Sequence, residues 1–311
     1  MNKSNYRLIF MGTPEISAYV FEKLILSGYQ FVGLIAQEDQ FLGRKKILTK
    51  VPTKVIAEKY NIPVYQPAKI RLDYEFVNNL KPDLILTFSY GQIIPQGLLD
   101  IPKYGCLNIH GSLLPKYRGA APIQRAIMNG EKETGLTLME MIDKMDAGKM
   151  YAKINVLINE EDNYSSLSIK MQEAAFTLVK EYLPLYLKGQ LVGQKQNEEE
   201  VTFAHKIKDE GEKISLNLTK NEIVNHIRAL SYEPGAYLNF GDNKLKIYQA
   251  KILNDEISGQ LGEIVSLKEG VVMQAKDGQI VFLEVQLANR KKLQARDFIN
   301  GQKNLLGQIL N

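Results

Sequence analysis

The 311-residue sequence predicts an α/β fold: a mostly parallel sheet, followed by a small C-terminal β-barrel. Strand-like and helix-like segments alternate from the N-terminus, and the strand segments are almost continuously apolar, as in sheets covered on both faces. The C-terminal third instead contains short strand-like runs between glycine turns and little helix, which indicates the barrel. With 45% hydrophobic and 24% charged residues, the chain is long enough for two domains with cores.

The first segments form a βαβ unit. Residues 6–13 indicate a buried strand, residues 14–28 an amphipathic helix that begins at Pro14 and ends at Gly28, and residues 30–37 the next strand. The alternation continues with helices at 51–60 and 71–80 and strands at 62–66 and 83–90. We therefore expect a Rossmann-like sheet whose ligands bind beyond the carboxyl ends of its strands.

The second half of this domain is predicted to be a hairpin and a long helix. Apolar and polar residues alternate over 133–142 and 149–158, on either side of the turn DKMDAGK. The helix over 163–187 contains Pro184, which is expected to kink or split it.

The domain boundaries follow from a change in composition. Residues 189–217 are polar and poorly periodic, which is typical of a surface connection. We place the first domain at 1–189, the linker at 190–206 and an OB-like barrel domain at 207–311. The barrel domain is predicted to contain one helix, at 221–230.

Composition excludes several classes of protein. The net charge of +4 permits an acidic partner without requiring one, and the single Cys106, expected to be a small core residue, excludes a disulfide framework. With three histidines and one cysteine we expect no metal site. The sequence shows no signal-peptide pattern and no membrane-spanning stretch, so a cytoplasmic protein with no membrane partner is expected.

The densest candidate site follows a strand that ends at residues 107–110. Side chains alternate along a strand, so Asn108 and His110 point to one side and Ile109 to the other. An amide and an imidazole suit a carbonyl oxygen that gains negative charge. Two structural readings stay open from position alone: His110 as a hydrogen-bonded core histidine, and Asp146 as an ordinary turn former.

The run from Asn108 to Met150 resembles the active-site signature of the folate-dependent formyltransferases. The stretches FMGTPEISAYVFEKL, FSYGQIIP and LQARDFINGQKNLLGQIL extend the resemblance over nearly the whole chain. It implies a catalytic triad of Asn108, His110 and Asp146, and transfer of the formyl group of 10-formyltetrahydrofolate to the α-amine of methionine on initiator tRNA. Asn108 and His110 would stabilise the oxyanion, while Asp146 would orient His110 and accept the amine's proton through water.

The resemblance also implies two substrate surfaces and a monomer. A folate pocket would be formed by Ser89, Tyr90, Gly91, Gln92, Ile93, Ser112, Leu113, Leu114, Pro115 and Asp143. From the residues alone, core packing is the stronger reading for Ile93 and its neighbour Ile94. The tRNA would be held by Arg44, Lys45, Lys46 and Lys50 in the first domain and by Arg290, Lys291, Lys292 and Arg296 in the second.

Other functions remain to be weighed. A sugar-nucleotide formyltransferase would share the catalytic domain, and a glycinamide ribonucleotide formyltransferase would leave the second domain unexplained. A dehydrogenase is disfavoured because Gly12-Thr13-Pro14 offers no Gly-x-Gly-x-x-Gly fingerprint. A noncatalytic RNA-binding module would not need the triad. The chain departs from the family at Ile214-Ser215-Leu216, where Ile-Asp-Trp is common, and His205 and His226 are expected to have surface or helix-packing roles.

Overall fold

The computed structural model describes residues 6–42 and 46–311, which divide into two compact units. The first unit consists of residues 1–122, 133–157 and 168–205. The second consists of residues 123–132, 158–167 and 206–311. The second unit therefore includes two short segments, 123–132 and 158–167, that precede the predicted linker, which no sequence pattern indicates.

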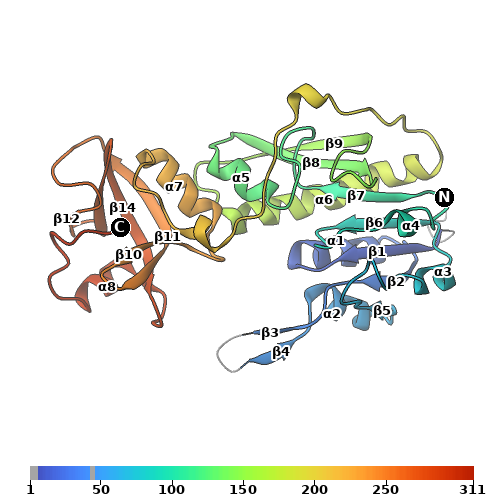
Figure 1. Cartoon of the computed structure of the whole chain (residues 1–311), viewed down its shortest axis with the longest axis horizontal. Helices are drawn as coiled ribbons and strands as arrows, with labels where there is room; N and C mark the ends of the chain where they lie inside the picture. Colours follow the sequence, from blue (N-terminus) through green and yellow to red (C-terminus); the bar gives the residue numbers. More distant parts are fainter. Residues whose placement is uncertain (1–5, 43–45) are drawn as a thin grey trace. The chain divides into compact units, whose positions relative to one another are not determined.

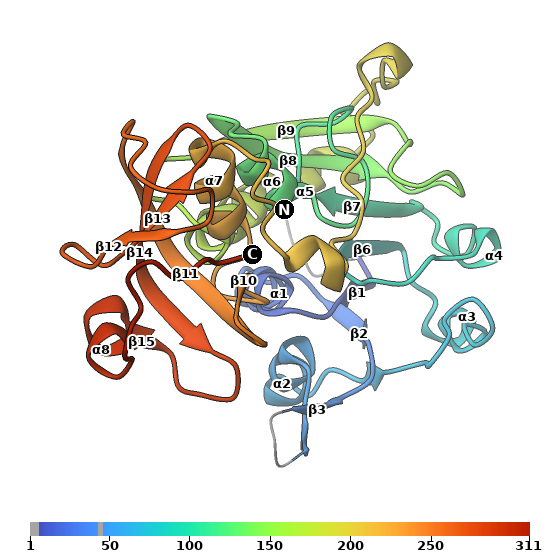
Figure 2. The same ribbon diagram turned by 60° about the vertical axis from the view of Figure 1, so that its left-hand side comes forward.

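The first unit contains a seven-stranded sheet in the order β5-β2-β1-β6-β7-β8-β9, and Figure 2 shows β2, β1, β6, β7, β8 and β9 side by side. The first five strands are parallel, while β8 pairs antiparallel with both β7 and β9. The mostly parallel sheet and the added hairpin are therefore confirmed. The strands are β1 (Leu8–Gly12), β2 (Phe31–Ile35), β5 (Val64–Tyr65), β6 (Leu84–Phe88), β7 (Cys106–His110), β8 (Glu133–Glu140) and β9 (Met150–Leu157).

Helices cover both faces of this sheet. Successive side chains of β1 point to opposite faces, so each face makes its own contacts with helices. Phe10 stacks on Phe21 of α1, with ring centroids 4.8 Å apart. Ile9 and Met11 lie in a buried cluster with residues of α3, α4 and the loops beside them. The helices are α1 (Glu15–Leu26), α2 (Pro52–Lys59), α3 (Phe76–Leu80), α4 (Gln96–Leu99), α5 (Pro122–Met128) and α6 (Tyr164–Leu187).

Two helix predictions need correction. The helix expected over 71–80 begins only at Phe76, and Leu72, which contributed to its apolar pattern, is 72% exposed. Pro184 does not split the long helix, since α6 is continuous from Tyr164 to Leu187. Pro184 lies in the final turn, so only the end of the helix lacks the hydrogen bond that a proline cannot donate.

A two-stranded hairpin that the sequence did not indicate follows β2. It pairs β3 (Gln40–Leu42) with β4 (Ile47–Thr49) and is drawn in blue at the lower edge of Figure 1. Lys46 directly precedes β4 and Lys50 directly follows it, whereas Arg44 and Lys45 fall outside the described residues. Asp39 fixes the base by accepting a 3.2 Å hydrogen bond from the Val51 N–H.

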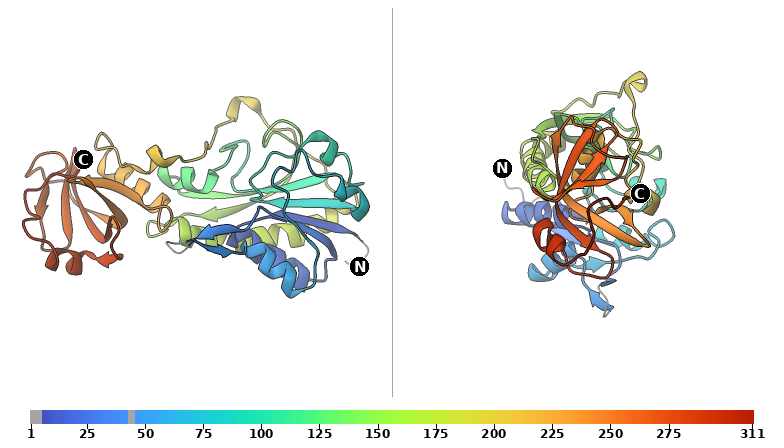
Figure 3. Two further views of the ribbon diagram at one scale, coloured as in Figure 1. Left: turned by 60° about the horizontal axis from the view of Figure 1, so that its bottom comes forward. Right: turned by 90° about the vertical axis from the view of Figure 1, so that its left-hand side faces the viewer.

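The second unit contains an antiparallel sheet in the order β10-β11-β14-β13-β12, with β15 paired to β14. Its last residues close the sheet, because Leu310 bridges to Phe240 of β10 and Ile309 bridges to Glu263 beside β12. Figure 3 shows these strands grouped as one curved unit. The predicted barrel is thus observed. Its strands are β10 (Ala236–Phe240), β11 (Asn243–Asn254), β12 (Ile264–Ser266), β13 (Val271–Ala275), β14 (Gly278–Leu287) and β15 (Leu293–Gln294).

Two helices accompany the barrel, although the sequence predicted only one. The predicted helix is α7 (Lys220–Ala229), which starts with a capping box between Thr219 and Glu222. The additional helix is α8 (Ala295–Asn300), whose six residues are too few to show a clear helical period but bury Ala295 and Phe298. Within the described ranges, no helix has the length and apolar character needed to cross a membrane.

Candidate active site

The candidate site begins at the carboxyl end of β7, between β6 and β8. Asn108 pairs with Thr87 on one side and Met139 on the other, and His110 pairs with Thr137. His110 is 5% exposed, and Ile109, on the opposite face of the strand, is 2% exposed. The amide and the imidazole therefore share one face of the sheet, in the alternation expected from the sequence.

The His110 ring is held between two acceptors. Its Nε2 lies 2.8 Å from the Tyr117 carbonyl oxygen, and because a carbonyl only accepts, Nε2 carries a hydrogen. Its Nδ1 lies 3.6 Å from Asp146 Oδ1. The imidazole is therefore fixed by a hydrogen bond at Nε2 and has a carboxylate near Nδ1.

The Asp146 carboxylate is positioned by the turn between β8 and β9. Its Oδ2 accepts a 2.9 Å hydrogen bond from the Gly119 N–H, while Oδ1 faces His110. Asp146 itself has a φ of 50°, a left-handed conformation that a non-glycine residue keeps only when its surroundings hold it there. Asp146 thus joins the loop after β7 to the turn after β8.

Three residues that the sequence did not single out surround this turn. The Arg118 side chain is 1% exposed; its Nε donates to Gln196 Oε1 at 2.9 Å, and its guanidinium lies 2.8 Å from Glu198 Oε1. Arg118 and Lys144 hold the pKa of Glu198 down at about 2. Gln196 and Glu198 come from the predicted linker, whose polar composition concealed their role because polar residues are also typical of solvated loops.

The loop predicted to bind folate, residues 112–115, is largely bonded to the protein itself. Ser112 Oγ donates to the Lys116 carbonyl at 2.6 Å, and the Ser112 carbonyl accepts from Thr137 Oγ1 at 2.7 Å. The Leu114 N–H donates to Thr137 Oγ1, and the Leu114 carbonyl accepts from Lys153 Nζ. Leu114 is fully buried and Leu113 is partly exposed, so Leu113 is the apolar side chain of this loop that a ligand can reach.

The other proposed folate residues follow β6. Ser89 and Gly91 have positive φ values of 51° and 94°, which turn the backbone sharply at the end of that strand. Core packing is wrong for Ile93, which is 82% exposed, and correct for Ile94, which is 6% exposed. Gln92 braces the loop by accepting from the Ile70 N–H at 2.8 Å, Tyr90 is buried, and Asp143 is exposed.

The predicted tRNA-binding residues that the structure describes are exposed. Lys50 is paired with Glu58 at 2.7 Å, which raises the pKa of the lysine. In the second unit Lys292 lies over two tyrosine rings, 4.1 Å from the centroid of Tyr232 and 4.3 Å from that of Tyr248. Cation–π contact therefore fixes the direction of one predicted phosphate ligand. Arg290 and Lys291 precede β15, and Arg296 lies on α8.

The remaining singled-out residues have packing roles. Cys106 is buried and burial raises its pKa to about 12, which confirms it as a core residue. His226 is largely buried on α7, and His205 is exposed and stacked on Phe203. In the segment where Ile-Asp-Trp is common, Ile214 is 1% exposed in the barrel core and Leu216 packs against that core.

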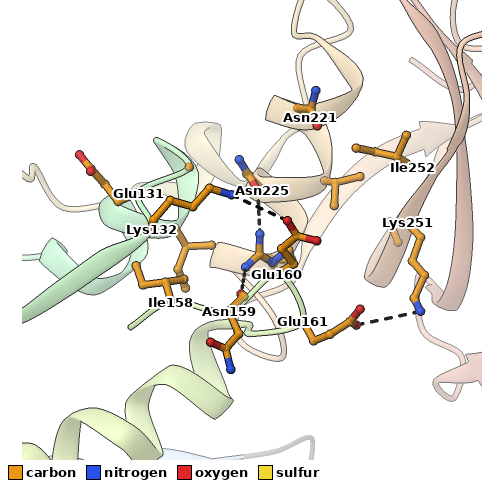
Figure 4. Close-up of a pocket in the computed structure, with 15 residues that line it drawn as sticks. Glu131, Lys132, Ile158, Asn159, Glu160, Glu161, Asn221, Asn225, Lys251 and Ile252 are labelled. Atoms are coloured by element: carbon orange, nitrogen blue, oxygen red, sulfur yellow. Dashed lines mark hydrogen bonds and ion pairs between the residues drawn. The ribbon is translucent and has the colours of Figure 1, made fainter. Parts of the chain in front are cut away.

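A cavity of about 360 Å³ lies within the second unit and contains none of the candidate site residues (Figure 4). Arg228 of α7 crosses it, donating to the Asn159 carbonyl at 2.8 Å and to Asn225 Oδ1 at 2.9 Å. The guanidinium thereby fixes the segment before α6 against α7. Within residues 6–42 and 46–311, no three His, Cys, Asp or Glu side chains are grouped as metal ligands.

Two profiles of one family match most of the chain. The formyl transferase profile matches residues 6–183, and the formyl transferase C-terminal domain profile matches residues 206–303. The chain belongs to the formyl transferase family. A curated formyl transferase, the methionyl-tRNA formyltransferase of Bacillus cereus (strain B4264), is 43% identical over 308 residues, which are 98% of this chain and 98% of the relative. The resemblance read from the sequence is thereby confirmed.

Solved structures share the formyl transferase fold. HypX from Aquifex aeolicus, in complex with tetrahydrofolic acid, has a TM-score of 0.70 at 19% identity; the alignment covers 98% of this chain and 49% of HypX, so this chain spans about half of that protein. The N-formyltransferase from Helicobacter canadensis, in complex with folinic acid and dTDP-3-aminofucose, has a TM-score of 0.68 at 21% identity and covers 89% of this chain and 98% of its own. At these identities the two structures show a common fold and do not indicate which acceptor this chain formylates.

Proposed function

We propose that this formyl transferase moves the formyl group of 10-formyltetrahydrofolate to the α-amine of methionine on initiator tRNA, in the cytoplasm. The observation that carries the proposal is the grouping of His110 and Asp146 with Asn108 at the end of β7. The 43% identity to a methionyl-tRNA formyltransferase over 98% of both chains supports this acceptor over an amino-sugar nucleotide.

The reaction needs charge stabilisation more than a strong base. An unperturbed α-amino group has a pKa of about 7.7 to 8.0, so a useful fraction is neutral near pH 7. The amine attacks the formyl carbon, and the C–N10 bond of the folate then breaks. One proton leaves the amine and one reaches N10, so protons balance, and the enzyme must stabilise the oxyanion that forms between these steps.

The proposed roles follow from the contacts of each side chain. Asn108 donates an amide N–H to the formyl oxygen, and His110 stabilises the oxyanion or supplies a proton to it. Asp146, 3.6 Å from the imidazole, orients His110 and accepts the amine's proton through an ordered water. A single oxyanion donor is worth roughly 3 kcal/mol in comparable reactions.

We assign the substrates to separate surfaces. The folate lies against residues 112–115, the loop 89–93 and Asp143, where exposed Ile93 and partly exposed Leu113 supply apolar contact. The tRNA is held by Arg44, Lys45, Lys46 and Lys50 and by Arg290, Lys291, Lys292 and Arg296. In this proposal residues 1–189 carry catalysis, 190–206 connect, 207–311 bind RNA, and the enzyme acts as a monomer.

A panel of acceptors tests the proposal. The purified chain is supplied with 10-formyltetrahydrofolate and with charged initiator tRNA, charged elongator tRNA, glycinamide ribonucleotide or an amino-sugar nucleotide. Formylated product is expected with charged initiator tRNA and not with the small acceptors. Product from the amino-sugar nucleotide alone would assign the chain to that branch of the family, and binding of tRNA without product from any acceptor would make it a noncatalytic RNA-binding protein.

A further inference from the structure

The segment that follows α6 lies against the candidate site instead of spanning solvent. The Met150 N–H donates to the Gln194 carbonyl and the Gln194 N–H donates to the Met150 carbonyl, both at 2.8 Å. Further along, the Arg118 N–H donates to the Thr202 carbonyl at 2.9 Å and the Ala204 N–H donates to the Arg118 carbonyl at 2.7 Å. Backbone pairing therefore fixes this segment at both ends, to β9 and to the loop after β7.

Gln196 lies between these two anchors with its carboxamide turned inward. The side chain is 9% exposed, and both of its polar atoms are used. Nε2 donates to the Asp146 carbonyl at 2.7 Å and to the Gly148 carbonyl at 2.9 Å, while Oε1 accepts from Arg118 Nε at 2.9 Å. A carboxamide is suited to this place because it offers two donors and an acceptor at one end of a short side chain.

These contacts act on the turn that contains Asp146, whose carboxylate faces His110. Asp146 is held at a φ of 50°, and its carboxylate reaches both the Gly119 N–H and the vicinity of His110 Nδ1. Gln196 binds the carbonyl of that same residue and of Gly148 within the same turn. Loss of the Gln196 bonds would remove contacts that hold the turn in this conformation, which matters because left-handed backbone at a non-glycine residue is intrinsically disfavoured.

We propose that Gln196 is a positioning residue, which holds the Asp146 turn in the conformation that places its carboxylate opposite His110. The buried Arg118 guanidinium supports Gln196 from the other side and is itself neutralised by Glu198. Through Gln196, the segment counted as a linker therefore supports the candidate site. The inference rests on the proposed function for its kinetic consequence, but its structural consequence at His110 is measurable without activity.

The test compares Gln196→Glu with Gln194→Glu. The first change keeps the shape of the side chain but replaces the two donors that bind carbonyl groups with an acceptor oxygen. The second makes the same chemical change two residues earlier, at an exposed side chain whose residue is paired through its backbone. Gln196→Met, which has a similar length and no amide, serves as a second variant if Gln196→Glu does not fold.

Two readouts separate positioning from the function itself. In single-turnover formyl transfer, Gln196→Glu is expected to lower the rate about tenfold or more, with KM for the charged tRNA changed less than about twofold, and Gln194→Glu is expected to match the wild type. The chain has three histidines, so ¹⁵N-labelled histidine spectra are simple to assign. The His110 nitrogen signals should shift in Gln196→Glu and stay in place in Gln194→Glu.

Each outcome decides one question. Unchanged His110 signals and an unchanged rate in a folded Gln196 variant would overturn the positioning role. Equal losses in both glutamate variants would also overturn it, because a general charge effect would then explain them. If His110 signals shift in Gln196→Glu but the wild-type protein formylates none of the acceptors, the positioning role is supported and the proposed function is refuted.

Discussion

Asn108 is the side chain whose chemistry is easiest to isolate, because it points from β7 toward the candidate site and its amide can be removed without disturbing a buried charge. Asn108→Ala is expected to slow turnover at least about a hundredfold, the usual loss for one oxyanion donor. KM for both substrates should change little, because the contact forms mainly in the transition state. Steady-state kinetics test this, and a variant that loses KM but keeps kcat would place Asn108 in ground-state binding.

His226 makes a prediction about pH. Burial lowers its pKa below the ordinary 6.5, and its Nε2 is buried without a hydrogen-bond partner. The unfolded chain therefore binds a proton more readily than the folded chain. The free energy of unfolding should be at its full value above pH 6.5 and fall as the pH drops from there toward the lower pKa of the folded protein.

Denaturant unfolding at about pH 7.5 and about pH 5 measures this dependence. His226→Gln removes the titrating group and should flatten it, while His205→Gln changes an exposed histidine and serves as the control. A wild-type dependence that persists in His226→Gln would assign the effect to other groups.

At the scale of elements, the C-terminal residues of the barrel make a prediction about stability. Leu310 is fully buried, and its N–H donates to the Gly262 carbonyl at 2.8 Å. Leu310→Ala should lower the free energy of unfolding by about 2–5 kcal/mol, the range for emptying a buried leucine site. Leu306→Ala, at a side chain that is 61% exposed, should cost less than about 0.5 kcal/mol. Equal losses in free energy of unfolding for the two variants would mean that the Leu310 side chain does not contribute to closure of the sheet, which would then depend on backbone hydrogen bonds alone.

The elements also show where sequence patterns succeed. The strands β1, β2 and β6 are predictable because buried parallel strands are largely apolar, and α7 is predictable from its helical apolar pattern. The helix α8 and the hairpin of β3 and β4 are too short to show a period.

The site was predictable only in part. Spacing along one strand relates Asn108 to His110, whereas the turn containing Asp146 reaches them through tertiary folding that no local pattern encodes. Gln196 and Glu198 are hidden for the same reason: a polar residue that will be buried by a distant contact looks identical, in sequence, to one that will be solvated.

For the whole molecule, the proposed binding of RNA makes a prediction about salt. If exposed lysines of the second unit neutralise phosphates, Lys291→Glu should weaken tRNA binding and reduce the magnitude of the slope of log K against log salt by about 1. Lys268→Glu, a charge reversal at an exposed residue between β12 and β13, is the control. Binding measured at several salt concentrations tests this, and an unchanged slope would remove Lys291 from the RNA contact.

The account as a whole depends on His110 carrying charge stabilisation at the end of β7. The most direct test is the single-turnover rate of formyl transfer by His110→Ala with saturating 10-formyltetrahydrofolate and charged initiator tRNA. The account predicts a rate at least about a hundredfold below that of the wild type, with tRNA affinity within about twofold. A folded His110→Ala variant with a near-normal rate would contradict it.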